Sequence, residues 1–168
     1  TKPSKLASLW VRYGWNFNYY RVSTACHVYF PQNISPKMNQ TIAKVALTVH
    51  DYDEAIGFYV GKLNFKLIED TWINDNKRWV VVKPEGEGSA ALLLAKAVGE
   101  EQLQTVGRQS GGRVFLFLET DNLERDYQHL RHMGVTIVRK PVTEPYGKVA
   151  VFADLYGNLW DLIEPVKE

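Results

Sequence analysis

The sequence predicts an α+β fold built from two copies of a strand–helix–strand–strand–strand (βαβββ) module. Short apolar or alternating stretches, typical of strands, recur over residues 42–163 and are separated by turn residues. Two helical segments each follow the first strand of a set of four. Residues 51–65 also align with residues 121–135 at one constant offset, which indicates an internal duplication of the module.

Module one is expected over residues 40–98. Its first strand is predicted by the apolar pattern of residues 42–49, and Asp51 or Asp53 is placed to cap a helix that runs to about residue 62. Turn residues then separate three further strands. These strands are expected over 63–73, 77–83 and 90–95.

Module two is expected over residues 112–165 and repeats this order. The polar connector before it is expected to hold a short helical turn at 100–106. Its own helix, over residues 122–133, ends at Gly134, a residue type that commonly ends helices. Its strands are expected at 113–119, 135–138, 148–153 and 158–163. Together the modules are expected to form a strongly curved mixed sheet with helices outside.

The composition of the 168 residues, 45% hydrophobic and 23% charged, is that of an ordinary globular protein. A net charge of +1 offers no strong attraction to nucleic acid or acidic membranes, and no apolar run is long enough to cross a bilayer. We therefore expect neither partner. The single cysteine, Cys26, excludes an intramolecular disulfide and favours a reducing compartment, so we expect a cytoplasmic protein.

Residues 1–37 differ from the rest of the chain. They are rich in aromatic residues, contain basic residues but no acidic one, and end in the boundary residues Pro31 and Ser35–Pro36. Two interpretations stay open. The segment is either a leader that is not native, with Met38 as the natural start, or a native arm that docks on the domain or on a second copy. In both cases residues 38–168 are expected to form a single domain.

Three features together resemble the vicinal oxygen chelate superfamily, which includes glyoxalase I, bleomycin resistance proteins and extradiol dioxygenases. They are the segment Val45–Tyr59, the duplication, and the glycine-centred turn Asp154–Asp161. The resemblance covers residues 40–165 and implies that each module curls around a cavity. It does not imply one activity, because that superfamily includes isomerases, lyases, dioxygenases and proteins that sequester a drug.

Metal-dependent members of that superfamily bind a divalent ion through residues, usually His and Glu, on the first and last strands of the modules. Carried over by position, those sites fall on Lys44, Leu92, Asp161 and Arg113, or on Phe115 if the register slips. Lysine and arginine are protonated donors and leucine cannot coordinate, so only Asp161 is a possible ligand. Since zinc and similar ions need three or more protein ligands, we expect a member without a metal or other cofactor.

Lys44, Arg113 and Asp161 are expected to lie together. They form either a cationic pocket for an anionic or carbonyl-bearing molecule or a structural salt bridge in a vestigial site. Aromatic side chains on strands and loops are the second group of candidate ligand contacts, although such side chains also form ordinary cores. These candidates are Trp72, Trp79, Phe115, Phe117 and Tyr146.

These residues favour a metal-independent small-molecule binding protein that sequesters an aromatic or anionic compound. We expect a homodimer, because relatives commonly complete their cavities across a two-fold interface. The alternative is a lyase, isomerase or dioxygenase of the same superfamily that uses a divalent metal or metal-free acid/base chemistry. Glu119 and Asp161 are the catalytic candidates for that alternative, and Glu119 is equally placed to accept a hydrogen bond from the loop at Thr120.

Overall fold

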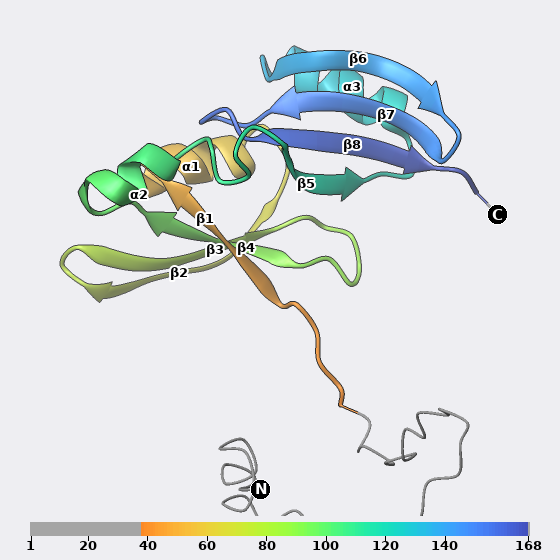
Figure 1. Ribbon diagram of the computed structural model, residues 1–168. Helices are drawn as coiled ribbons and strands as arrows, with labels where there is room; N and C mark the ends of the chain where they lie inside the picture. The colour runs from red at the N-terminus through yellow and green to blue at the C-terminus, as the bar shows by residue number, and fades with distance from the viewer. Residues whose placement is uncertain (1–37, 168) are drawn as a thin grey trace, which may run out of the picture. The chain divides into compact units, whose positions relative to one another are not determined.

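The computed structural model describes residues 38–167 and confirms the α+β fold (Figure 1). The proposed leader or arm at residues 1–37, which contains Cys26, lies outside the described residues. No helix within residues 38–167 combines the length and apolar character needed to cross a membrane.

Module one contains one helix and a four-stranded sheet. The helix is α1 (Tyr52–Tyr59), and the strands are β1 (Lys44–Val49), β2 (Lys66–Asn74), β3 (Lys77–Lys83) and β4 (Ala91–Lys96). The strand order is β1-β4-β3-β2, with β1 parallel to β4 and the other neighbours antiparallel. Asp51 begins α1 as expected, because its carboxylate accepts hydrogen bonds from the N–H groups of Asp53 and Glu54.

Module two repeats this arrangement after the short connecting helix α2 (Gly99–Thr105). Its elements are β5 (Val114–Glu119), α3 (Leu123–His132), β6 (Thr136–Glu144), β7 (Gly147–Ala153) and β8 (Leu159–Pro165). The strand order is β5-β8-β7-β6, with β5 parallel to β8. β6 is longer than expected and runs through Pro141, which lies at a register irregularity on this edge strand, where proline is tolerated.

Each module has its own sheet, and β1 and β5 are edge strands of the two sheets. The side chain of Gln109, from the loop before β5, stands where a neighbouring strand would pair with β1. Its Oε1 accepts a hydrogen bond from the N–H of Thr48 at 2.6 Å, and its Nε2 donates to the carbonyl of Ala46 at 3.1 Å. This part of the β1 edge is therefore satisfied by a side chain.

One hydrophobic core spans both modules. It contains residues of α1 and α3 together with one face of each sheet, including Leu47, Tyr59, Leu123 and Trp160. The Tyr59 hydroxyl also donates a hydrogen bond across the modules to Oδ2 of Asp154, at 2.7 Å. Alternate residues of the strands point to the opposite face of each sheet, which neither α1 nor α3 covers. We call these surfaces the open face of module one and the open face of module two.

Candidate functional site

Asp161 lies in the middle of β8, on the open face of module two. Its cross-strand partners are Phe117 on β5 and Val151 on β7. The residues on either side of it, Trp160 and Leu162, belong to the core. Because side chains alternate along a strand, Asp161 points away from the core and toward the open face.

The surface around Asp161 is largely apolar. Phe117 is 66% exposed, and Val151 is buried without belonging to the core that joins the modules. Two further polar residues share this face. Glu119 is the next outward residue of β5, and Arg139 on β6 pairs with Val151. The sequence did not single out Arg139, because the predicted strand ended at residue 138. In the structure β6 continues past this point, through Lys140 and Pro141.

The Asp161 carboxylate is not satisfied within the chain. Its Oδ1 is buried and has no hydrogen-bond partner among the described residues. Burial raises the pKa of Asp161 above its ordinary value of 3.8, and the positive charge of Arg139 partly offsets this rise. Arg139 itself forms an ion pair with Glu144, in which Nη1 and Oε1 are 3.8 Å apart. A buried acceptor without a partner costs about 1–3 kcal/mol, so Asp161 carries an energetic cost that no other side chain of the described residues relieves by a hydrogen bond to Oδ1.

Lys44 and Arg113 were expected to lie beside Asp161, but the structure places both of them elsewhere. Lys44 is exposed at the start of β1 in the other module, where its register partner is Ala91. Arg113 is exposed just before β5, and Phe117 takes the place opposite Asp161. The expectation failed for Lys44 because β1 belongs to the sheet of the other module, and for Arg113 because sequence position does not fix the register between β5 and β8, which is irregular near the start of β5.

The two strand tryptophans of module one point to opposite faces. Trp79 is partly buried and alternates on β3 with the core residue Val80, so it lies on the open face. Trp72 pairs with Arg78 across the hairpin. The Arg78 guanidinium lies 5.4 Å from the ring centroids of both Trp72 and Tyr52, the first residue of α1. Trp72 therefore lies on the helix side, and the two tryptophans cannot line one cleft.

The remaining sequence candidates lie apart from Asp161 or serve other contacts. Phe115 is partly buried and packs against the core, and Tyr146 is 57% exposed in the turn between β6 and β7. Glu119 does not accept a hydrogen bond from Thr120, contrary to one expectation. The Thr120 hydroxyl donates instead to Asp126, and its N–H donates to a carbonyl of β8.

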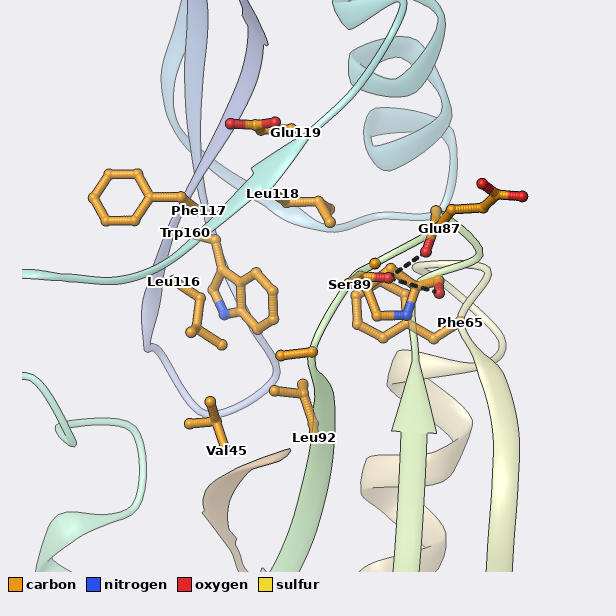
Figure 2. Close-up of a pocket in the computed structure, with 14 residues that line it drawn as sticks. Val45, Phe65, Glu87, Ser89, Leu92, Leu116, Phe117, Leu118, Glu119 and Trp160 are labelled. Atoms are coloured by element: carbon orange, nitrogen blue, oxygen red, sulfur yellow. Dashed lines mark hydrogen bonds between the residues drawn. The ribbon is translucent and has the colours of Figure 1, made fainter. Parts of the chain in front are cut away.

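A crevice of about 460 Å³ lies between the two modules, beside β5 (Figure 2). Its apolar lining comes from both modules and includes Val45, Phe65, Leu92, Leu116, Leu118 and Trp160. Figure 2 shows Leu116, Trp160 and Val45 turned toward a common space, whereas Phe117 and Glu119 point away from it. Its ionisable lining residues are Glu87 and Glu119.

The residues present in one chain do not fit the divalent metal that the resemblance implies. Of the positions carried over, Lys44 and Arg113 are cations and Leu92 is a buried core residue. Within residues 38–167, no group of three or more His, Cys, Asp or Glu side chains is arranged to hold an ion. Asp161 is the one side chain at these positions with oxygen donors, and a single carboxylate is a poor site for zinc or its neighbours.

Comparisons with known proteins agree on the family. The model of the Glyoxalase/Bleomycin resistance protein/Dioxygenase superfamily matches residues 41–162. A protein of Shewanella frigidimarina (strain NCIMB 400), described as uncharacterized, is 56% identical over 128 residues, which are 76% of this chain and 95% of that protein.

Two solved structures are similar in both sequence and fold. UcmS2 is 32% identical, with a TM-score of 0.67, and the match covers 76% of this chain and 99% of that one. TnmS3, an antibiotic binding protein from Streptomyces sp. CB03234, is 27% identical, with a TM-score of 0.62. That match covers 76% of this chain and 98% of TnmS3.

Proposed function

Because the chain belongs to the glyoxalase/bleomycin resistance protein/dioxygenase superfamily, we propose that it is a cytoplasmic, homodimeric protein that binds and sequesters an aromatic small molecule without a metal. The observation that carries this proposal is Asp161, a carboxylate with an unpartnered buried oxygen on an apolar open face. Such a face has the character of a ligand site that one chain leaves incomplete. The similarity to TnmS3, an antibiotic binding protein, supports binding as the function.

In the proposed dimer, the open face of module two in one copy lies against the open face of module one in a second copy. Both faces carry apolar side chains that are at least partly exposed, such as Phe117 (66% exposed) in module two and Trp79 in module one. The duplication also places opposite charges at equivalent positions. Glu69 in module one and Arg139 in module two each pair with the valine of the neighbouring strand. The two faces are therefore complementary in charge as well as in apolar character.

The proposed cavity lies between these faces. Asp161 and Phe117 line it from one copy, and Trp79 and Lys44 line it from the second, because both of the latter point to the open face of module one. This arrangement retains four of the residues singled out from the sequence and leaves out Trp72, which lies on the helix side.

Tryptophan fluorescence tests both the binding and its place. We expect aromatic antibiotics with fused rings to quench the fluorescence of the protein, and Trp79→Phe to remove a large part of that quenching. Trp72→Phe is the matched control, since its side chain lies on the other face of the same hairpin, and it should leave the quenching unchanged. Quenching that survives in both variants would place the ligand in the crevice beside Trp160. Absence of quenching by any member of the series would contradict the proposed function.

Sedimentation equilibrium tests the dimer. The chain has a mass of 19.3 kDa, and we expect the protein at micromolar concentration to have twice this mass. Phe117→Asp should shift it to the monomer mass and abolish the quenching, because the charge would be buried between apolar faces. A monomeric wild-type protein that still binds ligand would show that one chain suffices.

A second candidate, a metal-free acid/base catalyst, is favoured by one observation. Burial raises the pKa of Asp161, which moves a carboxyl toward the range of an effective general acid, and Glu119 shares its face. Proton exchange tests this function. A catalyst of this kind should exchange the proton next to the carbonyl of benzoin in D₂O, and Asp161→Asn should abolish the exchange. Exchange that is absent, or unchanged by the substitution, would leave binding as the function.

A further inference from the structure

We propose that the molecule bound at the Asp161 face presents a hydrogen-bond donor, an amine or a hydroxyl group on a flat apolar body, and that it is not an anion. This inference rests on the proposed function and specifies the chemistry of its ligand. It replaces the anionic compound that the sequence suggested, which depended on Lys44 and Arg113 lying beside Asp161.

The first step is the chemistry of the unpartnered oxygen. An ionised carboxylate only accepts hydrogen bonds, and Oδ1 of Asp161 is buried with none to accept from the described residues. A donor group on the ligand supplies the missing bond, and a protonated amine also supplies the opposite charge. An anionic group would instead place two acceptors of like charge together in partly apolar surroundings.

The second step concerns the nearby cations. Arg139 shares the open face, yet it pairs across the sheet with Val151, one strand away from Asp161, and forms an ion pair with Glu144. It is not a hydrogen-bond partner of Oδ1. Glu119, the other ionisable side chain that β5 places on this face, is acidic. The charges around the face therefore favour a donor over an anion.

The third step is the apolar surface beside the carboxylate. Phe117 lies directly across β5 from Asp161, and its ring is largely exposed. An exposed ring next to an unpaired acceptor matches a ligand in which a flat apolar body lies close to one donor. A protonated amine also gains from proximity to an aromatic ring.

One arrangement of the proposed dimer would satisfy Asp161 without a ligand. Lys44 points to the open face of module one, and in the proposed dimer the Lys44 of a second copy faces the same cavity as Asp161. If that lysine bonds to the carboxylate, the ligand needs no donor. The experiment is designed to detect this case.

Three naphthalene compounds of similar size test the inference, with affinities measured by equilibrium dialysis at pH 7. They are 2-(aminomethyl)naphthalene, 2-naphthol and naphthalene-2-carboxylate, which differ in bearing a protonated amine, a neutral hydroxyl and an anion. We expect the amine and the naphthol to bind the wild-type protein about 10-fold more tightly than the carboxylate, the size of effect that a hydrogen bond to a charged group gives. The relative affinities of the amine and the naphthol tell which donor the site prefers.

Asp161→Asn should remove this preference, weakening the amine about 10-fold and strengthening the carboxylate. Glu101→Gln, which removes the same charge from an exposed position on α2, is the matched control and should change none of the three affinities. Lys44→Ala is measured as well, because it shows whether the lysine of a second copy occupies the carboxylate.

Three results would overturn the inference while leaving small-molecule binding intact. They are tighter binding of the carboxylate, a preference for the donors that survives in Asp161→Asn, and a preference that appears only in Lys44→Ala. The last would show that lysine occupies the carboxylate in the native protein. Failure of the wild-type protein to bind all three compounds would count against the proposed function itself, and the inference would fall with it.

Discussion

Two aspartates that lie close together in the chain, one in the turn from β7 into β8 and one in the middle of β8, have opposite surroundings. Asp154 is 5% exposed and accepts six hydrogen bonds. Its donors are the Tyr59 hydroxyl, the backbone N–H groups of Tyr156, Gly157 and Asn158, the Asn158 side chain and the Trp160 indole. Asp161, seven residues later, has a buried oxygen that accepts none from the described residues.

This difference separates a structural carboxylate from a candidate binding carboxylate. Asp154 closes the turn and, through Tyr59, connects α1 of module one to module two. All of its donors come from the chain, so it has no capacity left for a ligand. Asp161 has the same chemistry and lacks those donors. Its environment, and not its residue type, makes it the candidate for recognition.

Substituting Asp154, the carboxylate that accepts six hydrogen bonds, should have the largest effect on stability. Asp154→Ala would leave the Tyr59 hydroxyl, the Trp160 indole, the Asn158 amide and two backbone N–H groups without their acceptor, whereas the N–H of Gly157 keeps the backbone carbonyl of residue 154. We expect a loss of about 3–5 kcal/mol in the free energy of unfolding, measured by urea denaturation. Asp75→Ala, in the exposed turn between β2 and β3, is the control and should change stability by less than about 0.5 kcal/mol. Equal stabilities of the two variants would refute the structural role of Asp154.

Removing one donor should have an intermediate effect. Tyr59→Phe deletes the hydroxyl that reaches Asp154 from the other module and leaves the ring in the core. We expect a loss of about 1–2 kcal/mol in the same measurement, because Asp154 keeps its other donors. Tyr127→Phe, which alters a buried tyrosine of α3, provides a comparison and should have a smaller effect. A change for Tyr59→Phe no larger than for Tyr127→Phe would show that the bond between the modules contributes little.

Substituting Asp161, the carboxylate with an unpartnered oxygen, should have the smallest effect on stability. It should stabilise the protein, whereas the two substitutions above destabilise it. Burial raises the pKa of Asp161 above 3.8 in the folded chain, so the folded state holds its proton more tightly than the unfolded state. The stability of the wild-type protein should therefore fall as the pH rises from below 3.8 through the folded-state pKa. Asp161→Asn cannot ionise and avoids this loss.

We therefore expect Asp161→Asn to raise the free energy of unfolding at pH 7 by about 1 kcal/mol or less, with the gain disappearing toward pH 3. Urea denaturation at a series of pH values measures the gain in stability at pH 7 and its disappearance at lower pH. A loss of stability at pH 7 would mean that Asp161 has a partner in the native assembly, as a lysine from a second copy would provide.

Much of the fold followed from the sequence because local patterns determine it. The apolar periods located the eight strands and the helices α1 and α3 that the structure has within residues 38–167, and the strand expected over residues 77–83 has those bounds. Asp161 was also identified from sequence, because a carboxylate on an apolar final strand requires an explanation wherever it points.

The neighbours of Asp161 could not be predicted in this way, because they depend on register between distant strands. The residue opposite it, Phe117, is set by the pairing of β5 with β8, which contains an irregularity. A second irregularity, between Trp72 and Asn74, lies next to the hairpin turn that joins the two tryptophan-bearing strands. Such irregularities change which side chains share a face, and neither has a distinct signature in the sequence.

The amide of Gln109 has a consequence for how copies of this chain can meet. An unprotected edge strand invites further strands to add to its sheet, which is a common route to aggregation. At Thr48 and Ala46 this route is blocked, because a side chain already holds the N–H and the carbonyl that an incoming strand would need. At this part of β1, association must therefore proceed through side chains and not through the addition of a strand.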